Sequence, residues 1–338
     1  MSHPVNLYSS LWEPPVLDFP HTLLGHRDSQ DPDLAEHLEG FAGYLTQKGT
    51  RPMTAPLWAT LEHLQKVQHH VSVQVDADAL EEMSDWAMRA NALIFLTDGS
   101  VRDPSGLVLV SAQGASHPQA QVPHPPDAWA RKSINEDKLK RMGIPFAESL
   151  PPVCGAGEVA PRSAQEIAQR AQALLAVALH AEVVHSGDGP SATEICARLP
   201  DADFSPAEAL FLSEPSPSRQ DLVNHLWRYE SLRTMLWAIG LQDLPFPTET
   251  ADAATLSGCI LGIGPTTMVQ QATLRPETQL LDSLDLHLRL HWAVREAHRS
   301  GTPMPADLDG SVILERHTAL NWICGWHDAD WDQIDTPT

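Results

Sequence analysis

The chain of 338 residues has few cysteines and no long apolar run, and both absences exclude whole classes of protein. The most apolar helical stretch, 171–184, contains His180 and Glu182 and is too short to span a bilayer. Residues 1–15 lack the basic and apolar segments of a signal peptide, so we expect a cytoplasmic protein with no membrane partner. The four cysteines lie too far apart for a Cys-x-x-Cys metal or redox pair: Cys154, Cys196, Cys259 and Cys324.

Motifs that hold the common cofactors are also missing. None of the five lysines follows a glycine, which excludes a phosphate-binding Gly-x-x-x-x-Gly-Lys loop. Gly155 and Gly157 follow two prolines rather than a strand, which does not fit a dinucleotide-binding turn. Neither a Gly-x-Ser-x-Gly nucleophile turn nor a His-Glu-x-x-His metal helix occurs. We therefore expect no cofactor.

Positive charge is scarce, because 22 basic residues face 44 acidic ones, for a formal charge of −22. Such a field repels polyanions, so we expect no nucleic-acid partner and favour a basic protein as the partner. The basic cluster at 131–141 also contains Glu136 and Asp137, which is typical of a solvated helix face. Composition leaves the oligomeric state open.

Residues 1–112 alternate between helical and strand patterns. Helical spacing of apolar residues predicts helices over 33–47, 55–66 and 77–92. Short alternating or apolar runs predict strands over 5–10, 70–75, 93–96 and 107–110. Together they predict a small N-terminal α/β sandwich, for which a ferredoxin-like arrangement is one option.

Residues 113–127 are rich in proline and lack periodicity, so we place a linker there. Helix-start signals recur from 128 to 338. Ser163, Ser191 and Ser205 each precede a glutamate by three residues, which is the capping-box pattern. Apolar periodicity predicts long helices over 221–239 and 276–299. The predicted fold class is therefore α+β, with a mostly α-helical second domain.

Several motifs of this second region follow one another in a recognisable order. They are GIPFAESLP from Gly143, the segment from Arg162 to Arg170, WRYESLRTMLWAIGLQDLPFP from Trp227, DLHLRLHWAVREA from Asp285, ERHTALNW from Glu315 and DWDQIDT from Asp330. In this order they resemble the bacterial domain-of-unknown-function family 4272, over residues 130–336. The resemblance implies a helical domain that begins near residue 130, and it implies no activity.

The stretch 276–299 carries the most informative pattern of charges. Asp285 and Arg289 are four residues apart with the acid first, which is the favourable order for an ion pair on a helix. At helical spacing, one apolar face is formed by Leu280, Leu284, Leu288 and Trp292.

Arg295 falls near the centre of this apolar face, where an unpaired guanidinium is costly. We therefore expect it to be buried against an acid, either Glu230 or Glu315, in a half-buried network with Asp285 and Arg289. Such a network is either a structural clamp between helices or a pocket with perturbed pKa values.

Candidate site residues follow from this network and the motifs around it. The catalytic candidates are Glu230, Glu315 and His317. The ligand-binding candidates are Asp285, Arg289, Trp292, Arg295, Asn321 and Trp322.

His287 and His291 lie one helical turn apart, the spacing of two metal ligands, but no carboxylate pattern supplies the others, so we expect no metal. Trp326 and Trp331, near the C-terminus, are candidates for a partner surface.

These observations favour a non-catalytic binding or protein-interaction module, such as an immunity-like or adaptor protein. The alternative is a hydrolase-type enzyme that uses Glu230 or Glu315 with His317 in a cleft of the helical domain. An open cleft lined by these three residues would favour the enzyme, and an interior packed with tryptophan would favour the binding module.

Overall fold

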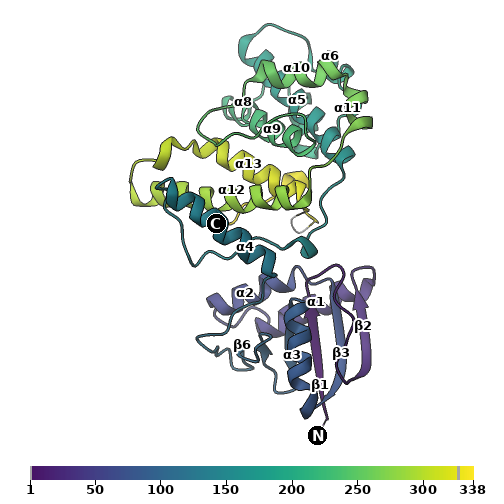
Figure 1. The fold of residues 1–338 in the computed structure, drawn as a ribbon. Coiled ribbons are helices and arrows are strands. Elements are labelled where there is room, and N and C mark those ends of the chain that lie inside the picture. Colours follow the sequence, from purple (N-terminus) through teal and green to yellow (C-terminus); the bar gives the residue numbers. More distant parts are fainter. Residues whose placement is uncertain (1, 326–327) are drawn as a thin grey trace. The chain divides into compact units, whose positions relative to one another are not determined.

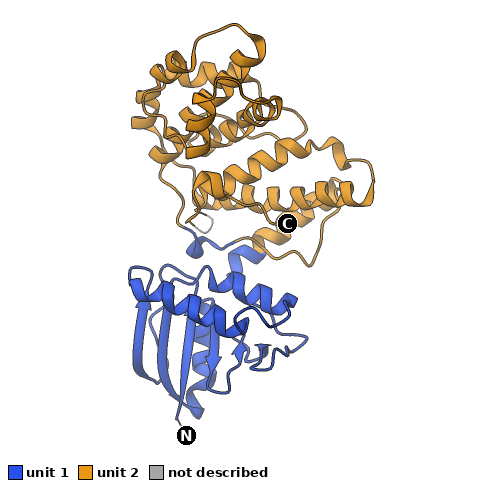
Figure 2. Ribbon diagram, turned by 180° about the vertical axis from the view of Figure 1, so that it is seen from behind, with its two compact units in different colours: residues 1–129, 154–159 blue, residues 130–153, 160–338 orange. Residues whose placement is uncertain are grey.

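The computed structural model describes residues 2–325 and 328–338, and the chain divides into two compact units. Unit 1 comprises residues 1–129 and 154–159, and unit 2 comprises residues 130–153 and 160–338 (Figure 2). Unit 1 contains a β-sheet covered by helices, whereas the regular structure described in unit 2 is helical. The predicted α+β class is confirmed.

Unit 1 is built on an antiparallel sheet with the strand order β2-β3-β1-β4-β5-β6. The predicted strands form β1 (Ser2–Ser9), β3 (His69–Asp76), β4 (Ala92–Leu96) and β6 (Val108–Val110). Sequence analysis missed β2 (Thr22–Asp28) and β5 (Val101–Arg102). It missed β2 because this edge strand is largely exposed and shows no apolar alternation, and β5 because two residues show no pattern.

Helices cover both faces of this sheet (Figure 1). Side chains alternate along β1, so that Val5 and Leu7 pack in the core with α3, and Tyr8 packs in the core with α1 and α2. A ferredoxin-like sandwich carries its helices on one face, so it is not the arrangement that forms. The helices are α1 (Pro32–Leu45), α2 (Ala55–Leu64) and α3 (Leu80–Arg89).

Residues 113–125 belong to unit 1 and form no helix or strand, whereas residues 126 and 127 of the predicted linker begin α4. The His117 amide donates to the carbonyl oxygen of Val108 (2.7 Å), and the Gln121 amide donates to the Asp103 carboxylate (3.1 Å). The domain boundary expected in this stretch stays a prediction for limited proteolysis.

Residues 154–159 also belong to unit 1, although they lie between two segments of unit 2. The carbonyl oxygen of Gly157 accepts the Trp12 amide (2.9 Å), and the Glu158 carboxylate accepts the side-chain amide of Asn91 (2.9 Å). The chain therefore passes from one unit to the other three times.

Unit 2 begins within α4 and is organised around α5, which is buried along most of its length and contacts α8, α9 and α11. The three predicted capping boxes, at Ser163, Ser191 and Ser205, are confirmed, since each serine and the glutamate three residues later accept each other's backbone amide. The helices are α4 (Pro126–Arg141), α5 (Ala164–Ser186), α6 (Ala192–Ala197), α7 (Pro206–Ser213), α8 (Arg219–Leu226), α9 (Arg228–Ala238), α10 (Ala253–Ile263), α11 (Pro265–Gln271), α12 (Glu277–Ser300) and α13 (Gly310–Ile323).

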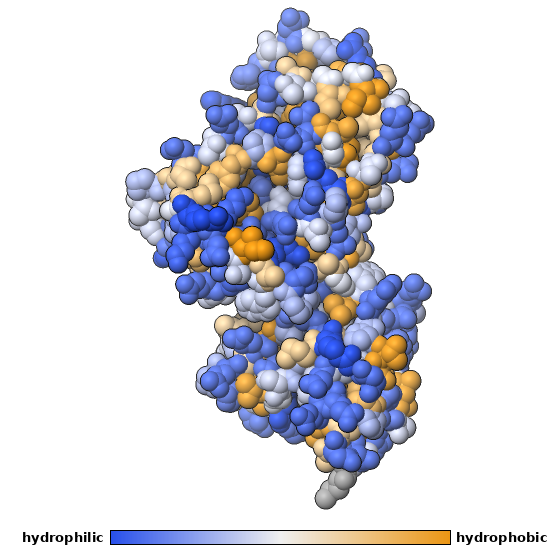
Figure 3. Space-filling view, in the orientation of Figure 1, coloured by the Kyte–Doolittle hydropathy of each residue, from blue (hydrophilic) through white to orange (hydrophobic). Residues whose placement is uncertain are grey.

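Within residues 2–325 and 328–338, no helix combines the length and the apolar character that crossing a membrane requires. Figure 3 shows hydrophilic side chains over most of the visible surface, in keeping with the excess of acidic residues.

Candidate functional site

The site residues predicted from sequence lie on α9, α12 and α13, where α13 contacts both of the other helices. The helix α13 begins at Asp309, whose carboxylate accepts the amides of Ser311 and Val312. The helix α12 ends at Gly301, which adopts the left-handed conformation (φ 63°) that glycine favours. These ends fix the register in which charged side chains enter the interior of unit 2.

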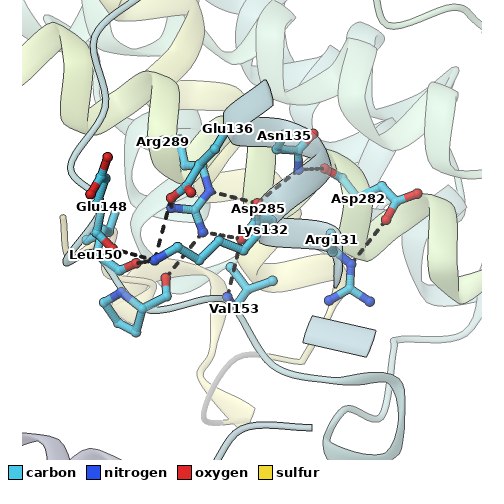
Figure 4. Close-up of polar contacts among 11 residues, drawn as sticks. Arg131, Lys132, Asn135, Glu136, Glu148, Leu150, Val153, Asp282, Asp285 and Arg289 are labelled. Carbon is cyan, nitrogen blue, oxygen red and sulfur yellow. Dashed lines mark hydrogen bonds and ion pairs between the residues drawn. The ribbon is translucent and has the colours of Figure 1, made fainter. Parts of the chain in front are cut away.

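The predicted ion pair between Asp285 and Arg289 is confirmed, and it is fully buried (Figure 4). Arg289 Nε lies 2.9 Å from Asp285 Oδ2, and Arg289 Nη2 lies 2.8 Å from Oδ1, so the contact is bidentate. The Asn135 side-chain amide donates to Oδ2 (2.9 Å), and Arg289 Nη1 donates to Glu136 Oε1 (3.1 Å). The pair therefore ties α12 to α4.

Lys132 extends this cluster toward the loop that follows α4 (Figure 4). Its ammonium donates to the carbonyl oxygens of Glu148 (2.6 Å) and Leu150 (2.8 Å) and lies 3.5 Å from Glu136 Oε1. The two cations Lys132 and Arg289 thus share one carboxylate, which fixes the loop at 148–151 against both helices.

Glu230 is buried against Arg316. Both Nε (3.0 Å) and Nη2 (2.9 Å) of Arg316 donate to Glu230 Oε2, and the other carboxylate oxygen accepts the Ala251 amide. Arg316 Nη1 donates to the carbonyl oxygen of Pro245 (2.6 Å). Burial lowers the pKa of Arg316, and the neighbouring Glu230 opposes that effect. The spacing of Val312, Arg316 and Leu320 on one face of α13 is the sequence signal that could have identified this arginine.

The prediction that Arg295 is buried against Glu230 or Glu315 is wrong. Arg295 is exposed and donates to Thr338 Oγ1 (2.7 Å). The buried face of α12 includes Leu284, Asp285, His287 and His291, whereas Leu288 and Trp292 are only half-buried. The predicted apolar face is therefore buried only in its first half, at Leu280 and Leu284, because polar side chains occupy part of the buried face farther along the helix.

Glu315 has a partner set of its own. Arg228 Nη1 lies 3.0 Å from Glu315 Oε2, and the Ser231 hydroxyl donates to the same oxygen (2.6 Å). Sequence analysis also missed a third buried pair, Arg170 with Glu208, because Glu208 belongs to a capping box and such residues are usually exposed.

Three histidines of α12 and α13, His287, His291 and His317, are buried, and burial lowers the pKa of each. His317 Nδ1 lies 3.1 Å from His291 Nδ1, and burial together with neighbouring histidines lowers the pKa of His317 well below its ordinary value. Burial, then Arg316 and Lys138, hold the pKa of His287 at about 3. In the described part of the chain, no three His, Cys, Asp or Glu side chains are placed to hold a metal ion together.

Asn321 and Trp322 contact the C-terminal segment. The Asn321 side-chain amide donates to the carbonyl oxygen of Asp335 (2.8 Å), and Trp322 packs edge-on against Trp331 with 5.8 Å between ring centroids. Trp331 is only 7% exposed, so the expectation that it lies at a partner surface is wrong for the described structure. Trp326, the other tryptophan of that prediction, lies outside the described residues.

A groove of about 450 Å³ lies beside the charge cluster of Asp285 and Arg289. Asn135 and Asp282 belong to both, because Asn135 lines the groove and bonds Asp285, while Asp282 lines it and pairs with Arg131 (3.1 Å). The lining comes from α4, the end of α9, the loop at 244–247 and α12: Asn135, Lys138, Met142, Trp237, Leu244, Pro245, Phe246, Pro247, Asp282, Ser283, Leu286 and His287. Sequence analysis missed the groove because no single motif contains it.

Comparison with known proteins bears on the region that holds this groove. Residues 131–334, more than half of the chain, match the family described as domain of unknown function 4272 (DUF4272). The chain belongs to this family. Neither a curated protein nor a solved structure matches it. The DUF4272 region contains the whole lining of the groove and the three buried arginine–carboxylate pairs.

One cation of the DUF4272 domain, Lys138, lines the groove, and two others, Arg275 and Arg233, contact Trp237 of the lining and Asp243, which precedes Leu244 of the lining. Lys138 Nζ lies 5.9 Å from the ring centroid of Phe246, and the guanidinium of Arg275 lies 5.4 Å from that of Trp237. Arg275 also donates to the carbonyl oxygens of Trp237 (2.5 Å) and Gln242 (3.4 Å). Arg233 Nε donates to the carbonyl oxygen of Asp243 (3.1 Å). Their contacts within the described chain are thus with neutral groups.

Proposed function

We propose that unit 2 is a non-catalytic binding module and that the groove between α4 and α12 holds its ligand. The observation that carries this proposal is the make-up of the groove. Its walls are mostly apolar and aromatic, including Trp237, Phe246 and Leu286, and a few polar groups interrupt them. Concave sites that bind small molecules have this composition.

The buried pairs support the proposal because they hold the groove in shape before any ligand arrives. Arg316 fixes the loop at 244–247 through Pro245, and Asp285 fixes Asn135 on α4. Walls that are already ordered lose little conformational entropy when a ligand binds.

The geometry favours a binding module over the hydrolase alternative. A general base needs a lone pair that reaches the substrate. Both oxygens of Glu230 accept hydrogen bonds, Glu315 is held by Arg228 and Ser231, and His317 faces His291 in the interior. Glu315 and His317 are two residues apart on α13, so their side chains project to different sides of the helix.

Binding at the groove is tested with 1-naphthalenemethanol and 1-naphthoate as probes. We expect at least one of them to shift the indole N–H signal of Trp237 in a heteronuclear NMR spectrum, with the signal assigned by Trp237→Phe. Ser283→Phe places a ring in the groove and should abolish the shift, whereas Ser300→Phe, at the exposed end of the same helix, should preserve it. The proposal fails if neither probe moves the Trp237 signal, or if Ser283→Phe binds like the wild type.

We also propose, as a second candidate, that unit 1 presents an acidic surface to a basic protein partner, in an immunity-like or adaptor role in the cytoplasm. Exposed acids without an ion pair among the described residues lie at the end of β3 and in the segment after it, namely Asp76, Asp78, Glu81, Glu82 and Asp85. A ten-residue polylysine peptide is the probe, and neutralising these acids should weaken its binding at least ten-fold. Equal loss on neutralising as many exposed acids of unit 2 would contradict a dedicated surface. Cell fractionation tests the compartment.

A further inference from the structure

We propose that the ligand of the groove is an organic anion: a carboxylate or sulfonate on an aromatic or apolar body. Lys138 would hold the acid group at the mouth, and Trp237 and Phe246 would contact the body. This inference rests on the proposed function of the groove and adds the chemical class of what it binds.

The walls of the groove offer apolar surface to a ligand. Trp237, Phe246 and Leu286 are each half-buried, so part of each side chain still faces the groove. Met142 is 40% exposed and lies on the same lining. A ring placed among them removes apolar surface from water on both partners, which stabilises the complex at about 25 cal/mol per Å².

Lys138 offers a positive charge on the lining of the groove. Acids outnumber bases two to one in this chain, and the buried arginines of unit 2 each meet a carboxylate. Lys138 is exposed on the lining, and no carboxylate pairs with it among the described residues. The carboxylate of the groove, Asp282, is already paired with Arg131. An anionic ligand supplies the missing counter-charge.

Arg275 does not line the groove, but its guanidinium packs on the Trp237 ring of the lining and adds positive charge next to this wall, because its described hydrogen bonds are to neutral oxygens. His287, on the floor, adds no charge. Its Nδ1 lies 2.8 Å from the carbonyl oxygen of Ser283, an acceptor, so Nδ1 carries the proton and Nε2 carries the lone pair. The groove therefore combines a positive mouth with a neutral floor, which matches a ligand whose charge lies at one end.

Three probes share the same naphthalene ring and differ in charge, so they distinguish the effect of ligand charge on affinity from the effect of ligand shape. They are 1-naphthoate, 1-naphthalenemethanol and 1-naphthylmethylammonium. Dissociation constants come from titration of the Trp237 indole signal. We expect naphthoate to bind at least five-fold tighter than the alcohol, the ammonium compound to bind weakest, and the naphthoate affinity to fall as salt is added. Lys138→Gln should remove the advantage of naphthoate, and Lys138→Glu should reverse it.

Lys140→Gln is the matched control, because Lys140 is an exposed lysine of the same helix that does not line the groove. It should leave all three affinities unchanged. Equal affinity for naphthoate and the alcohol in the wild type overturns the anionic class but leaves the groove as a binding site. Equal effects of Lys138→Gln and Lys140→Gln also overturn it, since the general field would then explain the preference. No Trp237 shift with any probe overturns the proposed function itself.

Discussion

The described arginine–carboxylate pairs of the two units differ in how deeply they are buried. In unit 1, the ion pairs Arg89–Asp18 and Arg102–Asp98 lie at the surface, with side chains 31–55% exposed. In unit 2, the arginines of the pairs with Asp285, Glu230 and Glu208 are at most 3% exposed. Unit 2 therefore depends on buried arginines, whose removal from water is costly unless each one keeps its carboxylate partner.

This difference explains why the apolar pattern of the sequence predicted the buried residues well in unit 1 and less well in unit 2. Along β1 the alternation of Val5, Leu7 and Tyr8 matches the two cores, so apolar pattern and burial agree. Along α12 and α13 the apolar pattern and the burial disagree, because the charged residues Asp285, Arg289 and Arg316 are among the most buried.

The largest effect should come from breaking a buried pair. Arg316→Met leaves the Glu230 carboxylate buried without its cation, and we expect a loss of about 3–5 kcal/mol in the free energy of unfolding of unit 2. Amide hydrogen exchange of α9 and α13 measures this loss separately from unit 1.

The double variant Arg316→Met with Glu230→Gln is the control for this prediction. It removes both charges, so it should recover a large part of the stability. If the single variant retains the exchange protection of the wild type, the contrast between the units is wrong.

Acid should weaken unit 2 through its buried histidines. The pKa of His287 is about 3 in the folded protein, against an ordinary value of 6.5. The unfolded chain therefore binds a proton that the folded chain excludes, so stability that is complete above pH 6.5 is lost as pH falls toward 3. Between pH 7 and pH 5 we expect a loss of about 2 kcal/mol from this residue. His287→Gln should flatten that pH dependence in exchange of α12, and an unchanged slope would contradict the assignment.

The surface pair of unit 1 should matter little. We expect Arg89→Ala to change the free energy of unfolding by less than about 1 kcal/mol, because water screens exposed ion pairs. Urea unfolding followed by exchange of α3 peptides measures it. A loss of stability comparable to that of Arg316→Met would contradict the claim that the ion pairs of unit 1 matter less than those of unit 2.

Arg295→Met should have the smallest effect, within about 0.5 kcal/mol of the wild type. Arg295 is exposed, and its contact with Thr338 lies at the surface. A thermal melt beside Arg316→Met shows which of the two arginines the interior requires.

Much of the fold was predictable, because helix caps and apolar periodicity are local signals. The capping boxes at Ser163, Ser191 and Ser205 and the pair Asp285–Arg289 illustrate this, since each is set by residues three or four apart. The groove was not predictable, because its lining is contributed by segments more than a hundred residues apart. The partner of Glu230 was missed for the same reason, since 86 residues separate it from Arg316.

The segment 154–159 has a consequence for how unit 1 can be taken apart. A protease cut within 113–127 would separate most of unit 1 from the rest of the chain, but it would leave 154–159 on the other fragment. That short stretch carries the Gly157 carbonyl oxygen, which accepts the Trp12 amide, and the Glu158 carboxylate, which accepts the side-chain amide of Asn91. The nicked chain should thus behave as a split protein whose halves reassociate through fragment complementation, so the two fragments should separate under denaturing conditions and elute together without them.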